Sequence, residues 1–422
     1  MKLVSIFPYR VIKIRRSSIT AYFWLISYLF LIGTDVIAAQ REEVHPFVVP
    51  VQKQTTEAEE EHHPGYEIEI ITTLDAMADV SGGIKRQATA LGNFDLAIEG
   101  DTEKMGWWPR GKFLLQMLGH YGGQPGDLVG DLQGVSNIAA DNEIKLYQAW
   151  YEQQFFDERF SILAGLYDYN SEFYTLDTAG TFINSSFGIG PDVSQTSPSI
   201  YPDTATSIRL KYQITPTIYG LALVTDGYFL TDPELPRHHH LIPSLQDGLF
   251  MGMEVGMIHP QESSPAHSKL ALGVWHNTAD FNDFNDIPRK NVSGIYFIAE
   301  KTLFKGQNPS QGLAGFIQFG TTQGDRNQIA NYLGTGLTYQ GLFEHRSDDI
   351  LGLGLARATN SHQYLAANPG LLHSETTLEL TYQANLSHNF MLQPDLQYVI
   401  NPGTDPTLHN ALVVYFRVQK IF

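Results

Sequence analysis

The chain of 422 residues has no cysteine, few basic residues and no apolar run long enough for a membrane-spanning helix. Without cysteine, disulfides, zinc–thiolate sites and cysteine nucleophiles are excluded. The 27 lysines and arginines stand against 45 aspartates and glutamates, and the net charge of −18 argues against a nucleic-acid-binding protein, which carries a basic surface. A transmembrane helix needs about 20 mostly apolar residues in a row, so a bundle of such helices is also excluded.

The composition that remains is half polar and rich in aromatic residues. Hydrophobic residues make up 43% of the chain, charged residues 17% and aromatic residues 12%, which excludes general disorder. At roughly 150 residues per domain the length would allow about three domains, but β-barrels often exceed that size as one domain. In bulk, this is the composition of an outer-membrane β-barrel.

The amino terminus has the order of segments found in a secretory signal peptide. Basic residues within the first 16 positions precede an apolar run from Ile19 to Ile32, and the small residues Ala38 and Ala39 follow. A single membrane anchor is the alternative, but this run would reach only about 21 Å as a helix, less than the ~30 Å of a bilayer core. We expect a cleaved signal over residues 1–39 and a flexible acidic linker over residues 40–65.

From residue 66 onward, apolar and polar residues alternate with a period of two. Leu378 and Leu380 fall on one face of an expected strand, and Glu379 and Thr381 fall on the other. We predict sixteen such strands near residues 66–78, 86–99, 107–121, 143–155, 159–168, 204–213, 216–225, 247–259, 268–277, 292–304, 311–321, 333–345, 348–358, 373–387, 390–400 and 410–422. Most have about 10–13 residues, the length of a tilted strand that crosses a bilayer.

The expected connections alternate between short and long. Those after strands 4, 6, 12 and 14 are tight, whereas those after strands 3, 5, 7, 9, 11, 13 and 15 are longer and rich in Gly, Asn, Asp and Pro. Alternation of this kind is typical of an up-and-down barrel with periplasmic turns and external loops. A soluble sandwich or propeller is the alternative architecture.

The predicted fold is therefore all-β: a transmembrane up-and-down antiparallel β-barrel of about 16 strands over residues 66–422. In lipid every backbone N–H and C=O must be paired, so a chain without spanning helices has to close into a barrel. Sixteen strands enclose a lumen wide enough for water. The last strand ends in the aromatic Phe422, the type of signal that outer-membrane assembly machinery reads, which makes that machinery and outer-membrane lipid the expected partners.

Five long segments carry a resemblance to a known family. They are SGGIKR (81–86), LGNFDLAIEGDTEKMGWWP (91–109), GDLQGVSNIAADNEIKLYQAWYEQQF (130–155), LAGLYDYNSEFYTLDTAGTFINSSFGIGPD (163–192) and QPDLQYVINPG (393–403). Together they closely resemble the carbohydrate-selective porins of Gram-negative bacteria. In two respects the chain departs from that pattern: Thr404 stands where a second Gly is common, and the segment before the barrel is short and acidic.

The resemblance implies a sixteen-stranded barrel in the outer membrane that lets sugars and similar small polar solutes diffuse into the periplasm. No GxSxG, HExxH or P-loop motif occurs, so neither a reaction nor a cofactor nor a metal is expected. Three alternatives stay open: a general or cation-preferring diffusion porin, an outer-membrane barrel enzyme, and a surface barrel that binds a partner through its loops. A homo-oligomer is possible.

In sixteen-stranded porins the loop that corresponds to residues 169–203 folds inward and narrows the pore. Its aromatic residues, which include Phe173 and Tyr174, provide apolar surface for packing inside the barrel, and Asn184, Ser185 and Ser186 provide hydrogen bonds. The alternative is that these residues only brace the loop against the wall.

Parity along the strands selects candidates for solute binding. The alternation places five basic side chains and one amide on the polar faces of strands 3, 4 and 6, where they would form a basic wall. These residues are Arg110, Lys112, Gln116, Lys145, Arg209 and Lys211. Trp108 shares that face and is the preferred aromatic for contact with a sugar ring, whereas Trp150 is expected at the lipid interface. Glu379, Asp395 and Gln397 point inward from farther round the barrel. Opposed charges across a constriction orient polar solutes, unless the charges simply stay solvated.

Overall fold

The computed structural model describes residues 65–226, 248–259, 268–306 and 311–422. The expected signal peptide and nearly all of the expected linker lie outside these described residues. No helix in the described part of the chain is long and apolar enough to span a membrane.

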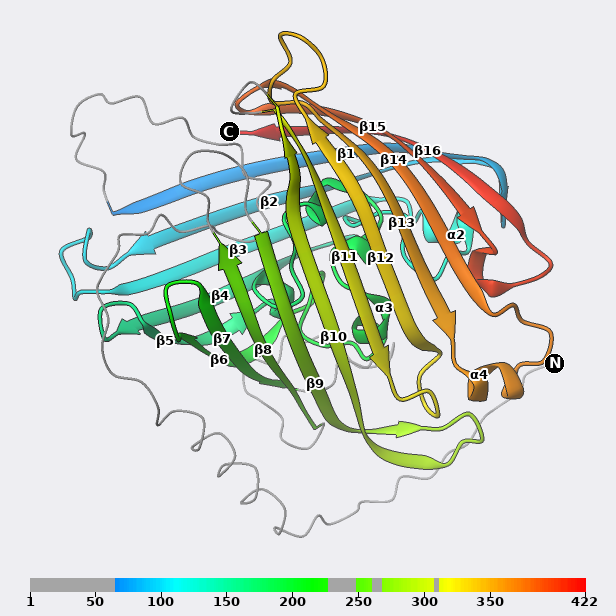
Figure 1. Cartoon of the computed structure of the whole chain (residues 1–422), viewed down its shortest axis with the longest axis horizontal. Helices are drawn as coiled ribbons and strands as arrows, with labels where there is room; N and C mark the ends of the chain where they lie inside the picture. Colours follow the sequence, from blue (N-terminus) through cyan, green and yellow to red (C-terminus); the bar gives the residue numbers. More distant parts are fainter. Residues whose placement is uncertain (1–64, 227–247, 260–267, 307–310) are drawn as a thin grey trace. The chain divides into compact units, whose positions relative to one another are not determined.

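Sixteen antiparallel strands form one closed barrel in which each strand pairs with its neighbours in the sequence (Figure 1). The strands are β1 (Tyr66–Gly83), β2 (Ala88–Asp101), β3 (Gly111–Gly122), β4 (Glu143–Phe155), β5 (Phe160–Tyr167), β6 (Ala205–Gln213), β7 (Ile218–Asp226), β8 (Leu249–His259), β9 (Ser268–Asn282), β10 (Pro288–Lys305), β11 (Gly312–Thr322), β12 (Ile329–Gln340), β13 (Ile350–Asn360), β14 (Ser374–Ser387), β15 (Phe390–Ile400) and β16 (His409–Ile421). The predicted fold and strand number are confirmed.

The barrel closes where β1 pairs with β16. The register runs from Ile71 opposite Ile421 through Asp75 opposite Arg417, and the N–H of Phe422 donates to the carbonyl oxygen of Ile70 at 2.9 Å. Closure removes the free sheet edges that would otherwise leave backbone groups unpaired in lipid.

The two faces of the strands divide as the alternation predicted. On β14, Leu378 and Leu380 are 39% and 46% exposed on the outside, whereas Glu379 and Thr381 point inward and are buried. Apolar side chains on the outer face suit contact with lipid tails. A soluble sandwich or propeller, whose apolar residues would fill a core, is excluded.

Several expected boundaries differ from the structure. β1 extends to Gly83 beyond the expected residue 78, and β3 begins at Gly111 instead of residue 107. β9 and β10 continue past the expected ends, so their connection is only residues 283–287 and not a long loop. β12 spans Ile329–Gln340 instead of 333–345. It ends at Gln340 because Gly341 takes a φ of +69° and begins a turn that extends to Asp349, where the Gly341 N–H donates to the Asp349 carbonyl. The prediction of a tight connection after this strand is therefore wrong.

Aromatic rings gather at the end of the barrel that carries the β4–β5 and β6–β7 turns, which we call the short-turn end. The rings in mutual contact there are Trp107 with Trp108 and Phe113, Phe155 with Phe156 and Phe160, Phe160 with Tyr212, and Phe343 with Tyr382. Amphipathic and aromatic rings favour the boundary between lipid and water, so these rings mark one membrane interface.

The connection between β5 and β6, residues 168–204, lies inside the ring of strands, which confirms the predicted inward fold (Figure 1). We call it the inward loop. It contains the short helix α3 (Pro191–Ser194), which contacts β11 and β12. A second connection, residues 123–142 with α2 (Gly126–Val129), packs against β1, and we call it the second loop. The small helix α4 (His362–Ala367) lies between β13 and β14.

Candidate functional site in the barrel lumen

Three carboxylates of the wall hold the inward loop by its backbone. Glu254 of β8 accepts the N–H of Tyr174, and Glu300 of β10 accepts the N–H groups of Asp177 and Thr178 at 3.2 and 2.8 Å. Glu379 of β14 accepts those of Ile183 and Asn184 at 2.5 and 3.0 Å. These contacts pair backbone donors of the loop with side chains of the wall and so fix the path of the loop.

Neutral side chains of the wall bind the carbonyl oxygens of the same loop. Tyr332 donates to Ser186 at 2.7 Å and Gln318 donates to Phe187 at 2.8 Å. Gln383 and Gln393 both donate to the carbonyl of Thr181. The wall thus satisfies both the donors and the acceptors of a loop that is buried away from water.

Aromatic packing fills the space between the loop and the wall. Phe173 stacks on Tyr169 with 4.6 Å between ring centres, and Phe182 contacts Phe187 and Phe316. Glycines make room for this contact: a Cβ on Gly354 of β13 would lie 2.7 Å from the ring of Phe187. The loop therefore closes tightly over β8–β14.

The opposite part of the lumen stays accessible to solvent. Several inward side chains of β1, β2 and β3 toward the short-turn end are exposed or half-buried, among them Glu67, Glu99, Lys112 and Gln116. Other inward side chains of these strands, such as Asp75 and Leu118, are buried. On β6 the Lys211 side chain is 47% exposed. The inward residues of β14, by contrast, are buried under the loop.

Arg209 and Lys211 face this interior, as parity predicted, and both bind Glu172 of the inward loop. Arg209 contacts Glu172 at 2.6 Å, Glu152 at 2.8 Å and the hydroxyl of Ser161 at 2.6 Å, while Lys211 contacts Glu172 at 3.0 Å. Burial alone would raise the pKa of the Glu172 carboxyl, but Arg209 and Lys211 outweigh burial and hold it at about 2. These two basic residues of the wall are therefore paired with acidic side chains.

The other predicted members of this wall have acidic neighbours too. Lys145 is buried and contacts Glu143 and Asp203, each at 2.6 Å. Gln116 donates to Asp95 at 2.8 Å and accepts from Gln148. Lys112 faces inward opposite Asp101 and Glu152 in the strand register.

For Arg110 and Trp108 the prediction of a lumen position is wrong. Thr102 Oγ1 donates to the Trp108 carbonyl and accepts from the Gly111 N–H, which keeps residues 102–110 as a turn, so β3 begins only at Gly111 and parity does not extend to these residues. Arg110 adopts a φ of +63° and pairs with Asp157 in the β4–β5 turn at 2.7 Å. Trp108 packs on Trp107 and donates to the Tyr151 hydroxyl, within the aromatic cluster of the short-turn end.

Trp150 points into the barrel, so its assignment by parity to the lipid interface is wrong. A register shift between Gln116 and Met117 leaves Tyr147 as an extra residue in β4, and such a bulge reverses the alternation beyond it. Trp150 consequently lies on the same face as Gln148 and Glu152 and packs against the aromatic core of the inward loop. Nothing in the sequence around Tyr147 signals the bulge.

The inward residues of β14 and β15 point into the barrel as expected, but they are buried beneath the loops. Besides the backbone contacts of Glu379, Gln397 donates to the carbonyl of Val135 at 3.0 Å and accepts from Asn184 Nδ2. Asp395 accepts from Gln397. The expected contact of Glu379, Asp395 and Gln397 with a solute is wrong in this structure, because loop atoms occupy the space in front of them.

The residues of the inward loop that the sequence singled out also hold the loop in place. Phe173 and Tyr174 are fully buried, and Asn184 Oδ1 accepts from the N–H and hydroxyl of Ser186. Ser185 donates to the carbonyl of Ser136 in the second loop. The interpretation that these residues brace the loop is favoured over direct contact with a solute.

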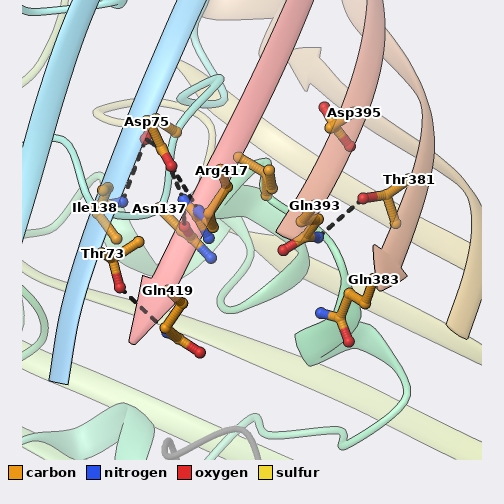
Figure 2. Close-up of polar contacts among 12 residues, drawn as sticks. Thr73, Asp75, Asn137, Ile138, Thr381, Gln383, Gln393, Asp395, Arg417 and Gln419 are labelled. Carbon is orange, nitrogen blue, oxygen red and sulfur yellow. Dashed lines mark hydrogen bonds and ion pairs between the residues drawn. The ribbon is translucent and has the colours of Figure 1, made fainter. Parts of the chain in front are cut away.

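An arginine of β16 holds the second loop against the wall. The alternation of the strands did not predict this contact. Arg417 of β16 binds Asp75 of β1 through two nitrogens at 2.7 and 2.8 Å and Asn137 of the second loop at 2.8 Å (Figure 2). Figure 2 also shows Gln393 reaching Thr381 on the neighbouring strand. Within the described residues no group of three His, Cys, Asp or Glu side chains is arranged to hold a metal ion.

Comparison with known proteins agrees with this architecture. The model of the OprB family, carbohydrate-selective porins, matches residues 85–422. The chain belongs to this family. It is 24% identical over 406 residues to Porin B of Pseudomonas aeruginosa, covering 85% of the chain and 88% of that protein. It is 26% identical over 175 residues to the putative porin QuiX of Acinetobacter baylyi, covering 36% of the chain and 39% of that protein.

A solved structure shows the same fold. The high-pH structure of Pseudomonas putida OprB superimposes with a TM-score of 0.76 at 22% identity, covering 85% of this chain and 94% of that one. Family membership makes this OprB porin a sugar-selective channel of the outer membrane, which confirms the function predicted from the sequence.

Proposed function

We propose that sugars cross this OprB porin along the accessible side of the lumen, between the inward loop and the inner faces of β1–β3 and β6. The single observation that carries the proposal is the contrast in burial across the lumen. Lys112, Gln116 and Lys211 remain accessible, whereas the inward residues of β14 are covered. Ammonium and amide groups at these positions would hydrogen-bond to sugar hydroxyls in place of water.

Side chains of both charge signs lie on the inner faces of these strands. Glu67 and Glu99 lie on the inner faces of β1 and β2, and Lys112 and Lys211 lie on β3 and β6. The electric field of these charges orders the water in the path. An apolar molecule must disrupt that water at a cost in free energy, whereas a polyhydroxylated molecule can replace the hydrogen bonds that the water makes. This arrangement favours neutral polar solutes over lipophilic ones.

Trp150 takes the role of the aromatic contact that parity gave to Trp108. Trp150 is half-buried and shares the inner face of β4 with Gln148 and Glu152. Aromatic rings accept the C–H face of a pyranose ring while neighbouring polar groups bind its hydroxyls.

Export and membrane insertion complete the proposal. Residues 1–39 act as a cleaved signal in a Gram-negative bacterium, residues 40–65 remain as an acidic linker, and the strand that ends at Phe422 is read by the assembly machinery. The exposed ring of Phe422 at the seam between β16 and β1 supports this reading.

Planar-bilayer recordings of the purified, folded protein test the proposed path. Sugar added to an open channel should reduce its conductance, and Trp150→Ala should weaken that block. Trp108→Ala is the matched control, because Trp108 lies outside the lumen. Equal block in both variants would place the sugar elsewhere, and a channel indifferent to sugars but open to cations would support the alternative of a general porin.

A further inference from the structure

An apolar hollow lies on the outer face of the barrel, over β9–β14. Its volume is about 970 Å³, and its lining includes Leu270, Ile317, Leu337, Leu353 and Leu378, which are 39–57% exposed. Ligand sites in proteins commonly have volumes of about 300–1,000 Å³. These residues occupy outward positions of their strands, so the hollow opens toward lipid. We call it the outer groove.

Short side chains at three outward positions leave this space empty. Ala299 of β10 and Thr335 of β12 lie in one row of the strand register, on either side of β11, and Gly315 of β11 lies in the next row. A Cβ on Gly315 would lie 3.0 Å from the ends of the Leu303 and Leu337 side chains, so the groove is narrow there and leucines form its sides. A narrow aliphatic groove of this shape suits an unbranched hydrocarbon chain.

One outward charge, Lys301 of β10, also lines the outer groove. Lys301 is exposed, and no hydrogen bond or ion pair joins its side chain to another residue in the described part of the chain. Its cross-strand neighbours Ser268 and Gly315 carry no charge. A lysine that faces lipid is costly at the centre of a bilayer but nearly free at its interfaces.

The position of Lys301 along β10 places it near one of these interfaces. β10 ends at Lys305, and because successive strands are antiparallel, the β10–β11 connection lies at the short-turn end. The long lysine side chain can extend from there to the headgroup region while its methylene groups stay in apolar surroundings. The outer groove thus has an aliphatic part toward the bilayer and a positive charge toward the headgroups.

We propose that the outer groove binds a glycerophospholipid with an anionic headgroup, whose acyl chain lies over Ala299 and Gly315 and whose phosphate meets Lys301. The short turns of outer-membrane barrels face the periplasm, so phospholipids of the periplasmic leaflet reach this end, whereas lipopolysaccharide occupies the opposite leaflet. A second copy docked through the same face would bring another Lys301 and no outward acid of the groove. A charge buried without a partner is costly, which favours the lipid over a second copy.

Native mass spectrometry of the folded, delipidated protein in detergent tests the role of the charge. The protein should bind one phosphatidylglycerol about five-fold more tightly than phosphatidylcholine with the same acyl chains, the gain expected from one lysine near a membrane surface. Lys301→Gln should abolish this preference. Lys290→Gln is the matched control and should keep it, because Lys290 is exposed near the other end of β10. Equal binding of the two lipids to the wild type, or an unchanged preference in Lys301→Gln, would overturn the proposal.

Filling the outer groove gives a second test that does not depend on charge. Gly315→Leu should weaken the binding of both lipids. Gly220→Leu should not, since Gly220 pairs with the exposed Val255 on the outer face of β7 and β8 and a Cβ there would meet only Ile214, at 3.8 Å. Thermal unfolding shows whether both variants are folded, and the comparison of Lys301→Gln with Lys290→Gln decides the proposal if Gly315→Leu is not.

Three results would assign the outer groove to another occupant or to none, and each would contradict the proposal. The first is unchanged binding of both lipids by folded Gly315→Leu. The second is a dimer of the wild type that Gly315→Leu dissociates, which would make a second copy the occupant. The third is tighter binding of lipid A than of phosphatidylglycerol, lost in Lys301→Gln, which would make lipopolysaccharide the occupant.

Discussion

Arg209 of β6 and Glu172 of the inward loop form a buried ion pair with 2.6 Å between Nε and Oε2. Glu172 also accepts from Lys211 and from the Tyr167 hydroxyl, so this one carboxylate fastens the first part of the loop to β5 and β6. Farther along, at Ile183 and Asn184, the same loop is fastened to β14 through Glu379. The loop thus bridges the lumen and confines the open path to one side.

Replacing Glu172 should change the ion selectivity of the channel. Glu172→Gln removes a negative charge beside Arg209 and Lys211, so the charge of the path becomes more positive and the preference for cations over anions should fall. The zero-current potential across a KCl gradient measures this. Glu158→Gln is the control, since Glu158 is exposed in the β4–β5 turn. The same shift in both variants would mean that Glu172 does not face the ions.

The Glu172 ion pair also predicts a dependence of stability on pH. Its pKa of about 2 in the folded protein lies below the ordinary value of 4.5, so the pair is fully stabilising above about pH 4.5 and loses its contribution as the pH falls toward 2. The wild type should therefore lose on the order of 2 kcal/mol more than Glu172→Gln across this range. Thermal unfolding of both proteins in detergent between these pH values makes the comparison. Parallel curves would contradict it.

Loss of the Glu379 anchor should widen the channel. Glu379→Ala leaves the N–H groups of Ile183 and Asn184 unpaired at a cost of about 1–3 kcal/mol each, so this part of the loop should detach from β14. Single-channel conductance should rise and block by sugar should weaken. Glu344→Ala, in the exposed β12–β13 connection, should leave both unchanged. Unaltered conductance in Glu379→Ala would mean that Glu254 and Glu300 suffice to hold the loop.

The strands and their faces could be predicted from the sequence because a period of two reports directly on which side chains meet lipid. Parity correctly assigned Arg209 and Lys211 to the interior, since β6 is regular. It failed at Trp150, because a single extra residue in β4 reverses the faces, and at Trp108, because the side-chain contacts of Thr102 delay the start of β3.

The role of the inward residues of β14 and β15 could not be predicted from the sequence, for a different reason. Whether Glu379 meets a solute or a loop depends on where residues 168–204 lie, and that is set by contacts between segments about 200 residues apart in the chain. One signal was present in the sequence: glycines occupy inward positions of β13, including Gly352 and Gly354. Their lack of a side chain allows Phe182 and Phe187 to approach.

The absence of cysteine from the chain allows the most direct test of the proposed path. A single cysteine introduced by Lys211→Cys or by Thr377→Cys can be treated with a charged methanethiosulfonate reagent during bilayer recording. We predict that Lys211→Cys reacts, that its conductance changes, and that sugar slows the reaction. Thr377→Cys, buried under the loops, should not react. Rapid modification of Thr377→Cys, or a reaction of Lys211→Cys that sugar leaves unaffected, would contradict a sugar path along β1–β3 and β6.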